Sequence, residues 1–204
     1  LLLVQVIALG IFSTDELVSE TNPRMTNNTL TDNGDGTWNV TYAVNLDTTL
    51  DSRYPTTPLG SASYIEVGWN ADQQNTRNSL LGFDLDAAGF PLNATIESAT
   101  LQVHQASSTG SVDAQTWNIH LQDWDVQYAT WVNRNGGSQW YQGGALGNSD
   151  SGSKQDQQHV ETNSNVVQFD ITQSVELAQY QQLTTSNSRV GVLLTPGFGS
   201  ESGV

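Results

Sequence analysis

The chain contains no cysteine, only six basic residues and no apolar run long enough to cross a membrane. A chain of 204 residues can bury a stable core without disulfides, so the absence of cysteine leaves the cellular compartment open. Six Lys and Arg against 21 Asp and Glu give a formal net charge of −15. A surface this acidic repels phosphate backbones and anionic lipid headgroups, so we expect no nucleic acid among its partners.

The longest uncharged apolar stretch is LLLVQVIALGIF, at residues 1–12. It is too short for a spanning helix, which needs about 20 apolar residues, and we predict no membrane span. No basic segment precedes it, as one would in a signal peptide. As a strand, the stretch would be apolar on both faces. Such a strand must be buried in a sandwich core or lodged in the groove of another chain.

The rest of the sequence is dominated by alternation of apolar and polar residues with a period of two. In TWNVTYAVNL, for example, Trp38, Val40 and Tyr42 alternate with polar or small residues, and the same alternation recurs in SYIEVGW, SLLGFDL, ATLQVHQ, TWNIHLQ, VVQFDI and RVGVLL. Gly-, Asn-, Asp- and Ser-containing turns separate these segments. The pattern predicts an all-β protein, an antiparallel, jelly-roll-like β-sandwich.

One short helix is predicted over residues 172–183. Thr172 can cap it, and Val175, Ala178 and Leu183 line one side. Residues 133–158 are poor in apolar side chains and predict a long surface loop, where binding sites tend to lie. A shift in composition near residues 45–50 suggests two parts. Residues 1–44 would form an N-terminal apolar strand and β-hairpin extension, and residues 45–204 the sandwich.

The main body, from about Thr48 onward, resembles the DNRLRE (disaggregatase-related) family of β-sandwich modules. The segments that carry the resemblance, in order, are LDSRYPTTPLGSASYIEVGW, NTRNSLLGFDLDAAGFPLNATIESATLQVH, WDVQYATWVN, NGGSQWYQGGALG, VVQFDITQSV and RVGVLLTPGFGSESG. The resemblance implies a non-catalytic module of a secreted, multidomain surface protein or polysaccharide-active enzyme, in a family that overlaps carbohydrate-binding modules.

The sequence departs from that family at two places. Val126 stands where an acidic residue is expected between Trp124 and Trp131. The family's last strand would follow GSESG, and the sequence ends at Val204. We therefore expect a sandwich without its final strand, which exposes unpaired backbone groups and an open groove.

The acidic residues include close pairs, but none predicts catalysis. Asp84 with Asp86 and Asp123 with Asp125 could mimic a glycosidase pair, yet nothing in the sequence places one acid in an apolar cleft. We predict that the protein is not an enzyme. Asp32 and Asp35, in TDNGDGTW, offer oxygen ligands that make Ca²⁺ a candidate cofactor. The alternative is an ordinary Asn-Gly/Asp-Gly turn before the Trp38 strand.

Aromatic and amide side chains around the Gly-rich segment form the candidate carbohydrate site. Exposed rings flanked by amides suit the C–H faces and hydroxyl rims of sugars, and the candidate residues are Trp131, Asn133, Gln139, Trp140 and Tyr141. Trp131 could instead anchor the core beneath the loop. Three N-x-S/T sequons, at Asn27, Asn39 and Asn93, suit an exported glycoprotein, although a Thr- and Asn-rich chain also produces such triplets by chance.

Together these patterns predict a non-catalytic, extracellular or cell-surface structural or adhesive subunit. Its apolar N-terminal strand would fill a groove in its own chain or, as we favour, in another copy or a neighbouring surface subunit. Donation from copy to copy does not close on itself and builds a filament. The assembly residues would be Leu1, Leu3, Val4, Val6, Ile7 and Leu9. The alternative function is a carbohydrate-binding module of a secreted polysaccharide-active protein, with polysaccharide as its partner.

Overall fold

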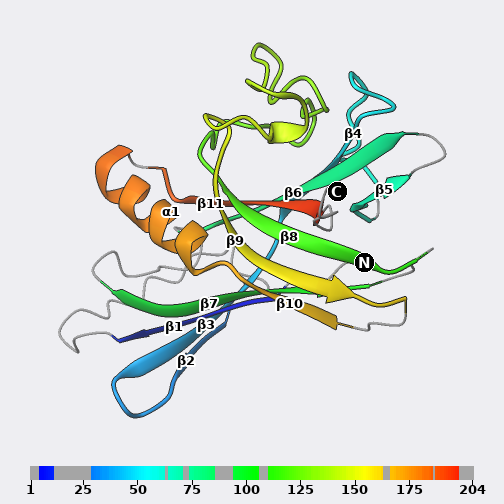
Figure 1. Ribbon diagram of the computed structural model, residues 1–204. Helices are drawn as coiled ribbons and strands as arrows, with labels where there is room; N and C mark the ends of the chain where they lie inside the picture. The colour runs from blue at the N-terminus through cyan, green and yellow to red at the C-terminus, as the bar shows by residue number, and fades with distance from the viewer. Residues whose placement is uncertain are drawn as a thin grey trace.

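The computed structural model is built from two antiparallel β-sheets and one helix, which confirms the predicted all-β class (Figure 1). It describes residues 5–11, 29–62, 64–70, 74–85, 94–105, 110–162, 166–185 and 187–197, with the backbone alone for residues 5–11 and 30. Within these residues, no helix is both long and apolar enough to cross a membrane.

Sheet A has five strands in the order β10-β7-β1-β3-β2. In chain order these are β1 (Gln5–Ile11), β2 (Thr29–Asp32), β3 (Thr37–Ala43), β7 (Thr95–His104) and β10 (Val166–Asp170). Each neighbouring pair is antiparallel, and β1 lies in the interior of the sheet, between β3 and β7.

Sheet B has six strands in the order β4-β6-β11-β8-β9, with β5 paired to the start of β6. Its strands are β4 (Leu46–Asp51), β5 (Gly68–Asn70), β6 (Asn75–Asp84), β8 (Val112–Ile119), β9 (Ser151–Val160) and β11 (Arg189–Gly197). Part of the predicted 133–158 surface loop is therefore wrong, because residues 151–160 form the edge strand β9. Its polar sequence, SGSKQDQQHV, suits a strand with one open edge.

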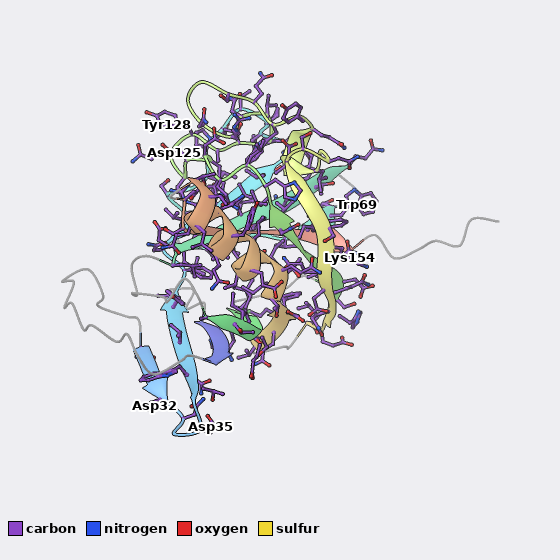
Figure 2. The ribbon with its side chains drawn as sticks, turned by 90° about the vertical axis from the view of Figure 1, so that its left-hand side faces the viewer. Asp32, Asp35, Trp69, Asp125, Tyr128 and Lys154 are labelled. Carbon is purple, nitrogen blue, oxygen red and sulfur yellow. The ribbon has the colours of Figure 1, made fainter. Side chains whose placement is uncertain are left out.

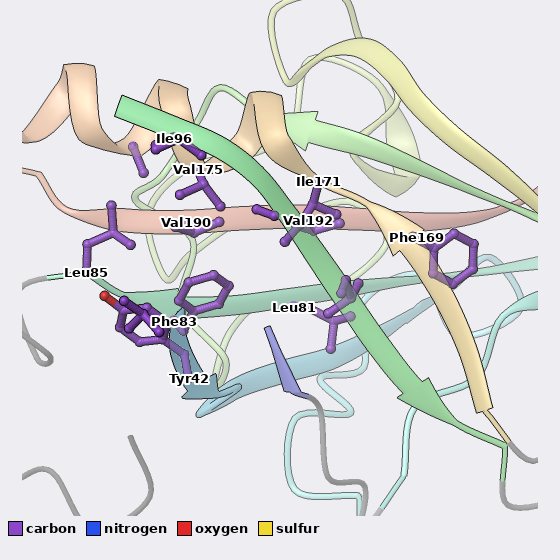
Figure 3. Close-up of a cluster of buried hydrophobic side chains, with 14 of the residues drawn as sticks. Tyr42, Leu81, Phe83, Leu85, Ile96, Phe169, Ile171, Val175, Val190 and Val192 are labelled. Atoms are coloured by element: carbon purple, nitrogen blue, oxygen red, sulfur yellow. The ribbon is translucent and has the colours of Figure 1, made fainter. Parts of the chain in front are cut away.

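The main core lies between the two sheets. Tyr42 of β3 and Phe83 of β6 meet across it, with ring centroids 5.2 Å apart. Val190 and Val192 of β11 lie in the same cluster, together with Phe169 of β10 (Figure 3). The alternating segments found in the sequence supply most of these side chains, which explains why the period of two predicted the strands.

Sheet B is also buried on its other face. Leu80 and Leu193 are fully buried there, next to Leu81 and Val192, which face the main core. Residues 120–150, here called the cap segment, cover this second face, and Trp124, Ala129, Trp140 and Ala145 from the cap segment complete the second cluster. Strands buried on both faces read as nearly continuous apolar runs, as SLLGF in β6 and VGVLL in β11 do.

Helix α1 (Thr172–Thr185) confirms the predicted helix and extends two residues beyond it. Val175 and Ala178 bury into the main core, whereas Leu183, predicted on the same side, is 60% exposed. The Thr172 hydroxyl accepts a hydrogen bond from the N–H of Ala99 at 3.0 Å and donates to the Asp170 carboxylate at 2.6 Å. The Asp170 carboxylate also accepts from the backbone N–H of Thr172 at 2.8 Å.

The predicted division near residue 45 does not separate two bodies among the described residues. Strands β1 and β3, from the expected N-terminal extension, are hydrogen-bonded into sheet A with β7. Val40 and Tyr42 of β3 are 2% and 1% exposed in the same core as Phe83 and Val190. Strands from both predicted parts therefore build one sandwich.

Candidate assembly strand and binding surfaces

Strand β1, which contains part of the predicted assembly run, is bonded along both of its edges. Val6 pairs with Tyr42 of β3 and with Leu101 of β7, whose side chains are 1% and 0% exposed. Ala8 pairs likewise with Val40 and Ala99, which are both buried. The backbone register thus places Val6 and Ala8 at positions flanked by core residues on both sides.

The alternate positions of β1 face different neighbours. Ile7 pairs with Thr41 and Thr100, and Leu9 pairs with Asn39 and Ser98. A register shift against β7 falls between Leu9 and Gly10, where β7 has an extra residue. Such a bulge fixes the register of β1 in the sheet. Leu1, Leu3 and Val4 of the predicted assembly set lie outside the described residues.

In this single chain, β1 pairs within its own chain. Without it, β3 and β7 would each present an unpaired edge in the middle of sheet A. Residues 12–28, between β1 and β2, number 17. At roughly 3.3–3.6 Å per residue, a segment of that length can span up to about 55–60 Å.

The cap segment corrects one predicted carbohydrate residue. Trp140 is only 6% exposed and lies in the second cluster over sheet B, where its indole N–H donates to the carbonyl of Thr130 at 3.0 Å. A ring held in this way anchors the cap and offers no stacking face to a ligand. Trp131 also packs against that cluster. This position agrees with the alternative prediction that Trp131 anchors the core beneath the loop.

Glycines allow the Trp131 ring to be covered. A Cβ added at Gly143 would lie 2.4 Å from the indole nitrogen of Trp131, and one at Gly144 would lie 2.7 Å from its ring. Gly144 also has a φ of +76°, which other residues rarely adopt. The Gly-rich sequence around Tyr141 therefore serves close backbone packing. Tyr141 itself is 74% exposed, as predicted for a surface aromatic.

Asp150 holds this part of the cap in place. Its carboxylate, with 0% of the residue exposed, accepts hydrogen bonds from the backbone N–H groups of Tyr141 (2.9 Å), Gln142 (2.9 Å) and Gly147 (3.1 Å). Its carbonyl accepts from the N–H of His120 at 2.9 Å. One buried carboxylate thus replaces the backbone partners that this irregular segment lacks.

Residues 132–140 of the cap form a short hairpin, and it carries the other two predicted amides. Asn133 and Gln139 face each other in an antiparallel bridge. The backbone N–H of Trp140 donates to the carbonyl of Val132 at 3.0 Å, and that of Val132 donates to Pro55 at 3.1 Å. The hairpin is therefore fixed from below by the buried Trp140 and from one side by the loop after β4.

Beside this hairpin the surface is hollowed into a shallow depression of about 480 Å³. Asn133 and Gln139 line it, and so does Tyr128, which is 51% exposed. The remaining lining residues are Thr56, Pro58, Thr130, Asn135, Gly136, Gly137 and Ser138. Tyr128 was not among the residues predicted from the sequence. The one signal for it there is its place between the two tryptophans of WDVQYATW.

A second depression, of about 580 Å³, is charged. Asp123, Asp125 and Arg189 are among its lining residues. Arg189 donates to the carbonyls of Gln122 and Trp124, both at 2.9 Å, and its guanidinium lies 5.6 Å from the centre of a Trp124 ring. Through these contacts Arg189, on β11, holds the start of the cap segment against sheet B.

The close acidic pairs are engaged in structural contacts. Asp123 forms an ion pair with Arg134 at 2.9 Å and accepts from the Asn135 amide. Asp125 accepts from the backbone N–H of Gln127 at 2.8 Å. Asp84 accepts a hydrogen bond from the hydroxyl of Ser188, and Asp86 lies outside the described residues.

Asp32 and Asp35 lie at the tip of the β2–β3 hairpin, at the opposite end of the molecule from Tyr128 (Figure 2). Asp32 accepts from the N–H of Gly34 at 2.8 Å, and Asp35 accepts from the N–H and hydroxyl of Thr37. The hydrogen bonds from Thr37 hold the pKa of Asp35 below its usual range. These contacts match the predicted turn. Among the described residues no group of three acidic, His or Cys side chains is close enough to hold a metal.

Of the three sequons, only Asn39 falls in the described part of the chain. It lies on β3, partly buried, and its amide nitrogen donates to Asn33 at 3.0 Å. A glycan at this nitrogen would replace one of its two hydrogens and leave a single N–H to donate. Asn27 and Asn93 lie outside the described residues.

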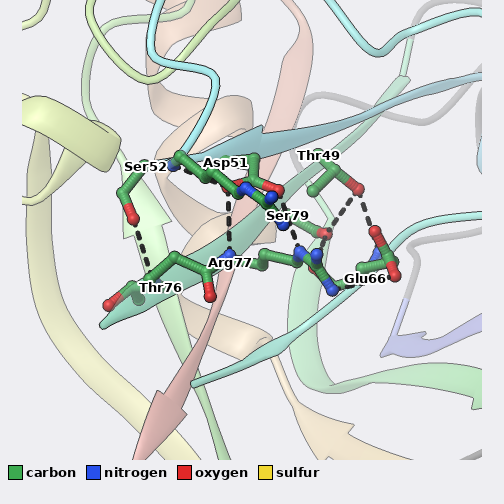
Figure 4. Close-up of polar contacts among 9 residues, drawn as sticks. Thr49, Asp51, Ser52, Glu66, Thr76, Arg77 and Ser79 are labelled. Atoms are coloured by element: carbon green, nitrogen blue, oxygen red, sulfur yellow. Dashed lines mark hydrogen bonds and ion pairs between the residues drawn. The ribbon is translucent and has the colours of Figure 1, made fainter. Parts of the chain in front are cut away.

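The most buried ion pair of the described residues was not found in the sequence (Figure 4). Asp51 of β4 is 3% exposed and bonds the guanidinium of Arg77 on β6 at 2.9 Å, while Arg77 also reaches Glu66 at 3.1 Å. Burial alone would raise the pKa of Asp51. Hydrogen bonds from Arg77, Asn75 and the N–H of Arg53 outweigh it and leave the pKa below its ordinary value.

No protein-family model matches this sequence, and no curated protein matches it either. The resemblance to the DNRLRE family therefore stays a prediction.

Proposed function

We propose that this protein is a non-catalytic, extracellular structural or adhesive subunit that assembles by exchanging β1 between copies. The observation that carries the proposal is the place of β1, an early strand bonded along both edges in the interior of sheet A. A strand in this interior position leaves a continuous groove between β3 and β7 whenever it withdraws.

The groove is complementary to β1 whichever copy supplies the strand. The ladder uses backbone groups that are the same in every copy, and the bulge at Leu9 and Gly10 fixes one register. The 17 residues between β1 and β2 are long enough to cross a small domain, whose diameter is about 30 Å. Each copy would then give one strand and receive one.

The consequence of such exchange is an open chain of subunits. Because the donated strand and the accepting groove are different surfaces, contacts run head to tail and do not close unless the rotation happens to form a ring. Backbone hydrogen bonds along both edges of β1 give each junction its stability. A filament or surface layer of these acidic subunits is the expected product.

Negative-stain microscopy of the full chain at increasing protein concentration tests the proposal. We expect filaments for the wild type and for Ala62→Asp, which changes an exposed alanine in a loop. Ala8→Asp, at a position whose ladder partners Val40 and Ala99 are buried, should abolish them. Wild-type protein that stays monomeric at every concentration, or Ala8→Asp filaments as abundant as those of the wild type, would contradict the proposal.

A further inference from the structure

The depression beside Tyr128 differs from the rest of this acidic molecule in one respect. Among the described residues that line it, none carries a charge, although the chain has 21 acidic residues and six basic ones. The other depression is lined by two aspartates and an arginine. A ligand suited to the uncharged depression is therefore itself neutral.

Its hydrogen-bonding groups are amides and hydroxyls. Thr56, Asn133, Ser138 and Gln139 all line it, and among the described residues their side chains have no hydrogen-bond partner. Each amide offers two donors and one acceptor oxygen, and each hydroxyl offers both roles. This mixture matches a ligand that carries many hydroxyl groups, which donate and accept in turn.

The depression also has one aromatic surface. Tyr128 is 51% exposed, and a Cβ added at Gly136 would lie 3.7 Å from its ring, so a side chain at residue 136 would cover part of the ring that the glycine leaves open. An exposed tyrosine ring can pack against the C–H face of a pyranose. The ring and the amides thus provide the two kinds of contact that a sugar presents.

Hydrogen bonds within residues 130–139 hold the hairpin that lines this depression. Thr130 donates to the carbonyl of Asn133 at 2.8 Å, and the Thr130 hydroxyl accepts from the N–H of Asn133 at 2.9 Å. The Arg134 guanidinium donates to the carbonyl of Gln139 at 3.1 Å. A site that is already ordered loses less conformational entropy on binding.

We infer that this depression binds a neutral polysaccharide, with Tyr128 as the stacking ring and Asn133 and Gln139 as hydrogen-bonding residues. The site does not depend on strand exchange. It lies on the cap over sheet B, whereas β1 belongs to sheet A on the other side of the sandwich (Figure 1). Subunits joined through β1 would keep this surface free.

Affinity electrophoresis through gels that contain a neutral β-glucan, a neutral galactomannan or the acidic polysaccharide alginate tests the inference. We expect at least one neutral polysaccharide to retard the protein and alginate to leave it unretarded. Tyr128→Ala and Gln139→Ala should each weaken the retardation roughly tenfold in apparent affinity, and Tyr128→Phe should keep most of it.

Tyr180→Ala is the matched control, because Tyr180 is 64% exposed on α1 and lies outside the depression. Tyr141→Ala removes the exposed tyrosine that the sequence had suggested. Both variants should bind like the wild type, and circular dichroism should show that every variant is folded. The inference is overturned if neither neutral polysaccharide retards the protein, if alginate retards it equally, or if Tyr128→Ala and Tyr180→Ala behave alike.

Discussion

At the scale of single residues, Asp51 shows how this acidic chain buries a charge. Its carboxylate lies between two strands of sheet B and is held by the guanidinium of Arg77, by the amide of Asn75 and by the N–H of Arg53. A buried carboxylate without such partners would be protonated or would destabilise the fold. The network therefore links β4 to β6 at the cost of desolvating one charge.

Asp51→Asn keeps the shape of the side chain but removes its charge. Breaking a buried ion pair from one side typically costs 3–5 kcal/mol, and we expect about 3 kcal/mol because Arg77 is partly exposed. Urea denaturation at neutral pH measures this difference. Asp123→Asn, in an exposed Arg–Asp pair, should lower the free energy of unfolding by less than about 1 kcal/mol.

The loss of stability in Asp51→Asn should depend on pH. The pKa of Asp51 is lowered in the folded state, so its ionisation stabilises the fold above the ordinary carboxyl range. That contribution is lost as the pH falls through the lowered pKa. The gap between wild type and Asp51→Asn should therefore shrink in acid, and a gap that stays constant or widens would contradict the assignment.

The exposure of single aromatic residues could not be predicted from the sequence pattern. Trp140 stands among glycines and amides, a context typical of an exposed aromatic, yet a buried hydrogen bond to Thr130 holds it in the core. The glycines provide space against Trp131, which no pattern along the chain reveals. Tyr128 became a candidate only when the fold brought Asn133 and Gln139 beside it. Tertiary contacts decide which aromatics are exposed.

At the scale of elements, most of the alternating segments form strands, but in SYIEVGW only the part from Gly68 onward does, as β5 (Gly68–Asn70). Strand β3 follows its alternating pattern, and helix α1 forms where it was predicted, although Leu183 is exposed and not on its buried side. Strand β9 carries ten largely polar residues because one of its edges and much of its surface face solvent, so it resembles a loop in composition. The cap segment is irregular, and its stability depends on side-chain contacts instead of a repeating pattern.

Asp150 is the residue on which the cap depends most clearly. Asp150→Ala would leave three backbone N–H groups of residues 141–147 without their acceptor, at roughly 1–3 kcal/mol for each one that stays buried. We expect faster hydrogen–deuterium exchange at Tyr141, Gln142 and Gly147, while β6 and β11 stay protected.

Asn148, an exposed residue two positions before Asp150, supplies the control for this experiment. Asn148→Ala removes a side chain that makes no hydrogen bond among the described residues, so exchange in the cap should match the wild type. Unchanged protection of Tyr141 and Gln142 in Asp150→Ala would show that the cap is held in another way.

At the scale of the whole molecule, the proposed functions occupy different layers of the sandwich. Exchange of β1 concerns sheet A, and the neutral depression lies on the cap over sheet B. The sequence predicted the all-β class and a strand in the apolar N-terminal run, of which residues 5–11 form β1. It could not show that β1 lies between β3 and β7, because that pairing joins segments about 90 residues apart.

The most direct measurement is disulfide crosslinking across the β1–β3 register. Ile7 and Thr41 are ladder partners, and partners in an antiparallel pair lie about 4.5–5.5 Å apart between Cα atoms, within reach of a disulfide. The chain has no cysteine of its own, so only introduced thiols can react. Thr29, one strand beyond Thr41, lies about 9–10 Å from Ile7 and gives a control pair that is out of reach.

Ile7→Cys and Thr41→Cys are prepared as separate proteins, unfolded, mixed, refolded and oxidised, and then separated on a non-reducing gel. Strand exchange predicts a covalent dimer of the two variants, and a ladder of covalent multimers when both cysteines are in one chain. The mixture of Ile7→Cys with Thr29→Cys should stay monomeric. Only monomers from the first mixture, together with purely internal disulfides in the double variant, would contradict assembly through β1.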